Sequence, residues 1–157
     1  MIGLPGFFRR RPPPPASQEG AFERAQAWLT EGRESEARAA LEGLLAAEPG
    51  HARALNLLGV IALRGGDAAG AVALFERAMG ADARLASARY NLGNALAELG
   101  RFEPALAAFE AALAIEPQHA DALCNRGLVL QQLQRLDEAA RSFEQALALR
   151  PDDAELH

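Results

Sequence analysis

Four copies of one 34-residue pattern fill most of the chain. Without an insertion or deletion between them, the copies occupy residues 18–51, 52–85, 86–119 and 120–153. Three positions recur in every copy. They are a small eighth residue (Ala25, Gly59, Gly93, Gly127), an alanine at the twentieth (Ala37, Ala71, Ala105, Ala139) and a large hydrophobe at the twenty-fourth (Leu41, Phe75, Phe109, Phe143). A unit this short cannot bury its own apolar side chains, so the copies must stack on one another.

Each copy has the pattern of two amphipathic helices. In the third copy, apolar residues recur at helical spacing from Ala88 to Leu99, and a second such stripe runs from Ala105 to Leu113. Gly100 lies between the stripes, where a glycine ends a helix at little cost. Pro117 stops the second helix, because the residue before a proline avoids helical geometry. The sequence therefore predicts an all-α chain of helical hairpins.

The stretches YNLGNALAELGRFEPALAAFEAALAIEP and CNRGLVLQQLQRLDEAARSFEQALALRP resemble the tetratricopeptide repeat family. That family has a small residue at position 8, alanine at positions 20 and 27, an aromatic at 24 and proline at 32. Arg24 and Arg126 depart from it, since leucine is usual there, and Ala83 replaces the proline. The resemblance implies an α-solenoid with a right-handed superhelical twist, of the kind found in bacterial multi-repeat proteins. It also implies a non-catalytic interaction scaffold or adaptor.

The two ends differ from the repeats. Residues 1–17 form a Pro/Arg-rich segment, MIGLPGFFRRRPPPPAS, for which we expect a flexible tail. A cap on the first repeat, a contact with an anionic membrane and a ligand for a polyproline groove are alternatives. Residues 154–157 read as the start of a fifth copy. We therefore expect either a piece of a longer protein or self-association through the uncapped last repeat.

The charge and composition of the chain limit the classes of partner that we expect it to bind. The chain has no lysine, and its net charge is −5 although Arg9, Arg10 and Arg11 precede the repeats. Nucleic acid is therefore not an expected partner of the repeats, because phosphate backbones demand clustered positive charge. No apolar run reaches the roughly 20 residues that a membrane-spanning helix needs. A single cysteine, Cys124, allows no internal disulfide and suits the cytoplasm.

No residue cluster indicates catalysis. His51 and His119 share position 34, two copies apart, and we expect them in solvent-facing turns. Cys124 has no CxxC partner and is predicted to be an ordinary helix thiol. The sequence thus predicts no enzyme activity, no metal site and no cofactor.

The resemblance instead implies a concave groove lined by the first helix of each copy, with a peptide or protein as its ligand. Carried over by position, the expected groove residues are Phe22, Gln26, Arg53, Asn56, Val60, Arg64, Ser87, Tyr90, Asn94, Glu98, Asp121, Cys124, Leu128 and Gln131. Phe22 and Tyr90 are the expected anchors.

Two finer resemblances concern asparagines. Asn94 and Asn125 match the clamp with which chaperone-binding members hold a C-terminal carboxylate, but Tyr90 replaces its key lysine. Asn91 and Asn125 match the asparagine ladder of O-linked N-acetylglucosamine transferases. An alternative function is therefore the substrate-recruiting arm of a larger enzyme such as a glycosyltransferase of that kind.

Overall fold

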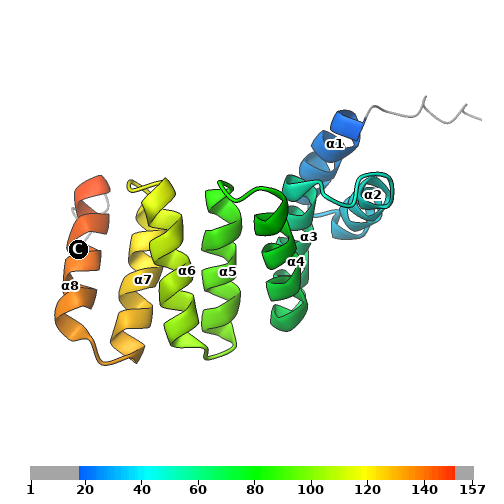
Figure 1. The fold of residues 1–157 in the computed structure, drawn as a ribbon. Helices are drawn as coiled ribbons and strands as arrows, with labels where there is room; N and C mark the ends of the chain where they lie inside the picture. The colour runs from blue at the N-terminus through cyan, green and yellow to red at the C-terminus, as the bar shows by residue number, and fades with distance from the viewer. Residues whose placement is uncertain (1–17, 151–157) are drawn as a thin grey trace, which may run out of the picture.

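The computed structural model describes residues 18–150. These residues form helices joined by short turns, and they contain no strand. The helices are α1 (Gln18–Thr30), α2 (Glu34–Ala47), α3 (Ala52–Arg64), α4 (Ala68–Ala81), α5 (Ala86–Glu98), α6 (Phe102–Ile115), α7 (Ala120–Gln132) and α8 (Leu136–Leu149). The predicted helical-repeat solenoid is confirmed (Figure 1). The Pro/Arg-rich segment and the start of a fifth copy lie outside the described residues, so our expectations for them stay predictions.

The turn inside each hairpin has the same left-handed residue. Gly32, Gly66 and Gly100 have φ angles of 76°, 84° and 72°, and Gln134 takes the equivalent place with φ 59°. Glycine adopts this conformation without steric cost, whereas a side chain at Gln134 is strained by it. The turn is therefore set by its position in the repeat, even where the glycine is missing.

Close packing inside each hairpin explains the small residue at position 8. A Cβ added to Gly59, Gly93 or Gly127 would lie 2.5 to 2.6 Å from the phenylalanine ring at position 24 of the same copy. The first copy has Ala25 and the smaller Leu41, both fully buried in one cluster. An extra methyl group on one helix is thus matched by a smaller side chain on the other.

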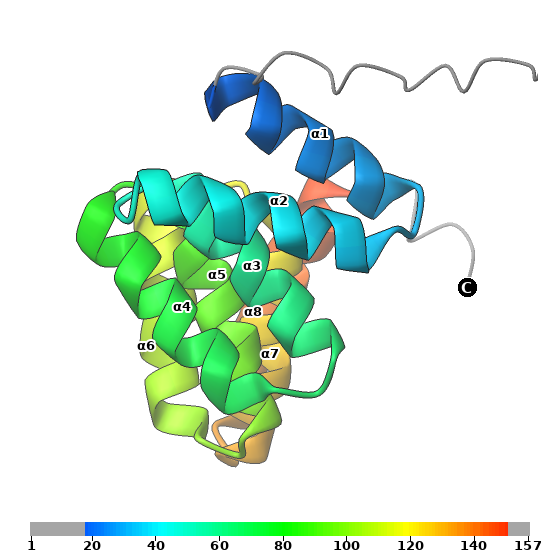
Figure 2. The same cartoon turned by 90° about the vertical axis from the view of Figure 1, so that its right-hand side faces the viewer.

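The hairpins form a row that turns at one end. Helices α3 to α8 run side by side, while α1 and α2 lie across the end of that row (Figures 1 and 2). One buried cluster extends from Ala62 to Ala146, and a second joins α1, α2 and α3 around Phe22, Leu41 and Ile61. The first hairpin thus joins the rest through its own core.

Candidate functional site

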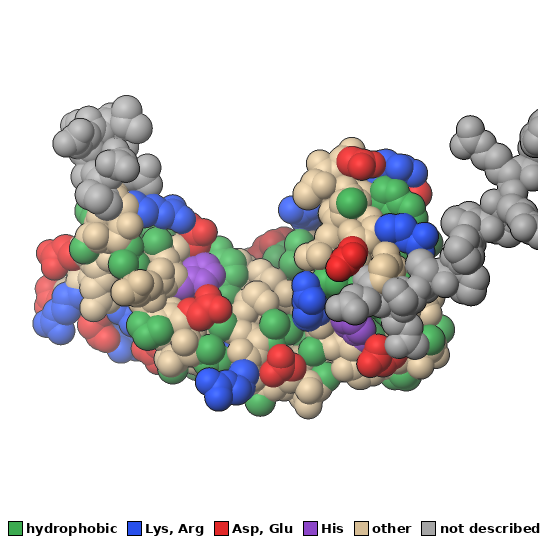
Figure 3. All heavy atoms as spheres, turned by 90° about the horizontal axis from the view of Figure 1, so that it is seen from above, with side chains coloured by type: hydrophobic (Ala, Val, Ile, Leu, Met, Phe, Trp, Pro, Cys, Tyr) green, Lys and Arg blue, Asp and Glu red, His purple; other side chains and the backbone are tan. Residues whose placement is uncertain are grey.

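The first helices of successive hairpins form the inner face of the molecule. Across repeats, α3 packs against α5 and α5 against α7, whereas the second helices of the described chain have no comparable mutual contact. Because the first helices lie closer together, the row curves toward them. Figure 3 shows the molecule hollowed between its two ends.

Polar side chains connect the first helices across this inner face. The Asn125 Nδ2 donates to Asn94 Oδ1 at 2.8 Å and to the Tyr90 hydroxyl at 3.3 Å. The Asn91 Nδ2 donates to Asn56 Oδ1 at 3.0 Å. The Asn56 Nδ2 donates to Ser87 Oγ at 3.3 Å. We call this set the amide ladder: Asn56, Ser87, Tyr90, Asn91, Asn94 and Asn125.

The amide ladder keeps unused hydrogen-bonding groups. Each asparagine offers two N–H donors and an acceptor oxygen. In the described chain, the Asn94 Nδ2 and the side-chain oxygens of Asn91 and Asn125 take part in no hydrogen bond. All three residues are partly exposed. The ladder can therefore bind the donors and acceptors of a polypeptide backbone.

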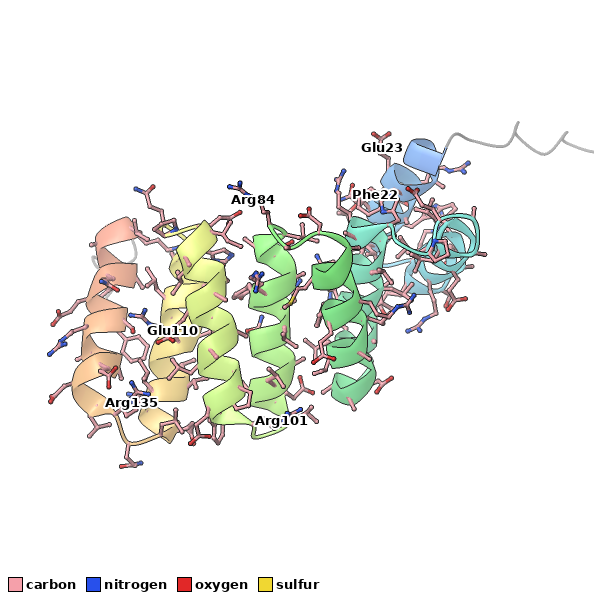
Figure 4. The ribbon with its side chains drawn as sticks, viewed as in Figure 1. Phe22, Glu23, Arg84, Arg101, Glu110 and Arg135 are labelled. Atoms are coloured by element: carbon pink, nitrogen blue, oxygen red, sulfur yellow. The ribbon has the colours of Figure 1, made fainter. Side chains whose placement is uncertain are left out.

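The amide ladder ends at Asn56 on α3, and an apolar pocket takes its place between α3 and α1. Position 6 is asparagine in the last two copies but Leu57 in the second and Glu23 in the first, and Glu23 projects outward from α1 (Figure 4). A pocket of about 260 Å³ opens between α1 and α3. Its lining residues are Gln26, Leu29, Thr30, Leu57, Val60 and Arg64. Three of the predicted groove residues, Gln26, Val60 and Arg64, thus meet at one pocket.

Phe22 does not project into the groove as an exposed anchor. It is only 4% exposed and belongs to the buried cluster of the first hairpin. His51 stacks on its ring, with the centroids 5.4 Å apart, and the Arg53 guanidinium lies 4.3 Å from the ring centroid. The ring therefore joins the first two hairpins.

Tyr90 has a similar structural role at the third junction. Its ring lies 4.6 Å from that of His119 and 6.0 Å from that of Phe109, measured between centroids. The Nδ1 atoms of His51 and His119 accept hydrogen bonds of 3.1 Å from the backbone N–H groups of Ala54 and Ala122. The two histidines do lie in turns, but they are half-buried helix caps and not the solvent-facing residues that we expected.

Sequence reasoning missed this pairing, although it left a signal. Both histidines directly precede a first helix, at the N-cap position, and both share their copy with an aromatic residue at position 5. Asn56 and Cys124 occupy position 5 in the other copies. The stacking therefore occurs at the first and third junctions.

The remaining predicted groove residues lie on α7, apart from Glu98 at the end of α5, and do not meet at one point. Asp121 is engaged by Arg150, whose Nη2 donates to its Oδ1 at 2.8 Å. Cys124 lines a pocket of about 220 Å³ with Phe143, Ala146, Leu147 and Arg150. Leu128 is 53% exposed. Glu98 and Gln131 are exposed, and their side chains have no hydrogen bond within the described chain.

Two carboxyl groups whose pKa is lowered lie outside the groove. The pKa of Glu138 is lowered, chiefly because Arg135 donates two hydrogen bonds of 2.7 Å to it. The pKa of Glu36 is lowered by its own backbone N–H and then by Arg33. Glu36 lies in the first turn of α2 and Glu138 in the first turn of α8, so both lowered pKa values arise from contacts at the start of a helix.

Other site chemistries find little support in residues 18–150. That span has no group of three or more His, Cys, Asp or Glu side chains arranged to hold a metal ion. Nor does it contain a helix with the length and apolarity to cross a membrane. The inner face is the candidate site because it carries the amide ladder.

Comparisons with known proteins agree with the helical-repeat fold. A family model described as "Tetratricopeptide repeat" matches residues 22–86 and 90–154. A crystal structure of MamA is similar, with a TM-score of 0.79, 23% identity, and coverage of 90% of this chain and 83% of that one. A second MamA structure has a TM-score of 0.70 and 26% identity over 85% of this chain and 73% of that one.

A further similar structure is described as "YrrB: a TPR protein with an unusual peptide-binding site". Its TM-score is 0.74 and its identity 23%, with coverage of 87% of this chain and 70% of that one. A comparison with curated protein sequences gave no significant match. These similarities support the fold of the chain.

Proposed function

This chain belongs to the tetratricopeptide repeat family, and from that premise we propose that it is a non-catalytic scaffold that binds an extended peptide segment in its concave groove. The observation that carries the proposal is the amide ladder with its unused donors and acceptors. An extended peptide presents one N–H and one C=O per residue, which asparagine side chains complement. Peptide binding by YrrB, as its description states, supports the proposal by analogy.

The asparagines are better targets for a test than the expected anchors. Phe22 and Tyr90 pack against histidines at hairpin junctions, so removing either would perturb the scaffold as well as the groove. Asn91 and Asn94 are partly exposed and lie on the same helix. Replacing both with alanine removes groove chemistry and leaves the apolar core unchanged.

The test is a selection of phage-displayed random dodecapeptides on the immobilised chain. We expect enriched peptides whose affinity falls about tenfold for the Asn91→Ala, Asn94→Ala variant, because each lost hydrogen bond costs about 0.5–1.5 kcal/mol. Gln118→Ala, in an exposed turn, is the matched control and should bind as the unaltered chain does. Circular dichroism should give the same helix content for all three proteins.

Two results would refute the proposal. One is a selection that enriches no peptide. The other is enriched peptides that bind the double variant and the unaltered chain equally, since the ligand would then lie elsewhere. The alternative function, a recruiting arm for a larger enzyme, uses the same groove and gains no separate support from the described residues. A cytoplasmic location, suited to the unpaired Cys124 thiol, is also part of the proposal.

A further inference from the structure

We propose that the peptide segment bound in the groove carries an aliphatic or aromatic side chain close to a carboxylate. The apolar side chain enters the pocket between α1 and α3, and the carboxylate pairs with Arg64 at the rim of that pocket. This inference rests on the proposed function and names the chemistry of its ligand.

The apolar half of the inference comes from the pocket itself. Leu29, Leu57 and Val60 line it and are only half-buried, although side chains of their kind gain most from full burial. The two polar side chains on its α1 side, Gln26 and Thr30, are exposed, and the Thr30 hydroxyl already donates to the Ala27 carbonyl at 2.7 Å. The pocket therefore binds an apolar group better than a polar one.

The acidic half comes from the distribution of charge along the groove. Helix α3 carries Arg53 and Arg64 and no acidic residue. Arg64 is 58% exposed, and its Nη1 is 3.7 Å from Glu34 Oε1, which is too long for a hydrogen bond. Negative charge lies further along, with Glu98 on α5 and Asp121 on α7. The ligand's carboxylate should accordingly lie over α3 and not over the other first helices.

The spacing of these features sets the length of the motif. Asn56, a member of the amide ladder, and Arg64 are on the same helix, about 12 Å apart along its axis at 1.5 Å per residue. An extended peptide covers that distance with about four residues. Backbone contacts at the ladder, an apolar side chain and a carboxylate thus fit within one short segment.

Fluorescein-labelled dodecapeptides on a Gly/Ser/Asn background test the inference by anisotropy titration. One carries Leu and Glu, one Leu alone, one Glu alone, one neither, and one Leu and Lys. We expect the Leu/Glu peptide to bind the unaltered chain most tightly, about two- to fivefold better than the Leu/Lys peptide, as exposed ion pairs contribute about 0.2–1 kcal/mol. In Arg64→Glu the preference between Glu and Lys should reverse.

Arg77→Glu is the matched control, because Arg77 is an exposed arginine on α4 with no ion pair in the described chain. It should keep the preference for Leu/Glu. The inference is overturned if the peptides bind without preference, if Arg64→Glu leaves the preference unchanged, or if none of them binds. Whether the proposed function survives is then decided separately, by the random-library selection and its loss in the Asn91→Ala, Asn94→Ala variant.

Discussion

At the scale of single residues, the hairpins are held together by glycine backbones that lie directly against phenylalanine rings. Gly59, Gly93 and Gly127 receive the rings of the second helices, and Ala25 opposite Leu41 is the compensated exchange. A Cβ added to Gly93 would lie 2.6 Å from the Phe109 ring, so the ring or the helix would have to move. The same exchange can be made deliberately in the third hairpin.

We expect Gly93→Ala to destabilise the chain by about 1–2 kcal/mol in urea unfolding, because overpacking costs more than the gain in helix propensity. Adding Phe109→Leu, which copies the first hairpin, should recover most of that loss. Gly43→Ala on α2 is the control: its Cβ would meet nothing within 4 Å, so it should stabilise by about 0.5–1 kcal/mol. This account would be contradicted if Gly93→Ala left the free energy of unfolding unchanged. It would also be contradicted if the Gly93→Ala, Phe109→Leu variant were less stable than both single variants.

Residue identity in the repeat register predicted the core well and the groove only in part. The buried alanines at position 20 follow directly from it, since Ala37, Ala71 and Ala105 are fully buried. Phe22 shows where it falls short. The position of a residue in the repeat predicts the direction in which its side chain leaves the helix. Whether the Phe22 ring stays exposed depends also on His51 and Arg53, which pack against it.

At the scale of helices, the start of α7 combines a cap and a stacking contact in one side chain. The His119 Nδ1 accepts from the Ala122 N–H at 3.1 Å, and the same ring lies 4.6 Å from Tyr90 on α5. The first interaction satisfies a free N–H of the helix end. The second joins α7 to the preceding hairpin, so helix formation and hairpin stacking depend on the same residue.

We therefore expect His119→Ala to destabilise the chain by about 1.5–2.5 kcal/mol, since a lost cap costs about 1 kcal/mol and an aromatic contact about 0.5–1.5 kcal/mol. His119→Asn keeps a capping acceptor but no ring, and should lose less than alanine does. Gln118→Ala, the exposed neighbour in the same turn, should be near neutral. Urea unfolding followed by circular dichroism measures all three, and equal losses in the alanine and asparagine variants would show that the cap contributes nothing.

Helix positions could be predicted from periodicity because each hairpin has its own apolar stripes and its own stop signals. The direction of the first hairpin could not. Helices α1 and α2 cross the end of the row (Figure 2), and that orientation depends on packing between hairpins through Ile61 and Leu58, which share the cluster of Phe22. The members of the amide ladder could all be named from the sequence, but their hydrogen bonds could not be predicted, since Asn56 and Asn91 pair across 35 residues and at different positions of the repeat.

At the scale of the whole molecule, the chain is a row in which each hairpin contacts mainly its neighbours. Stability in such a row is close to a sum of hairpin and junction contributions, so a defect has different consequences at the end and in the middle. The alanines at position 20 make this testable, because Ala105 is 0% exposed in the third hairpin and Ala139 is 2% exposed in the last one. The same substitution can thus be placed at two equivalent sites.

We expect both Ala105→Leu and Ala139→Leu to overpack their hairpins, by about 1–3 kcal/mol each. In Ala139→Leu, α7 and α8 lack a following hairpin in the described chain and can open alone, so amide hydrogen exchange should accelerate there and stay slow in α3 and α4. In Ala105→Leu, the strained hairpin has neighbours on both sides, so opening it uncouples the row and exchange should accelerate from α3 to α8. Uniform acceleration in both variants would mean that the row unfolds as one cooperative unit, and the additive description would then be wrong for this molecule.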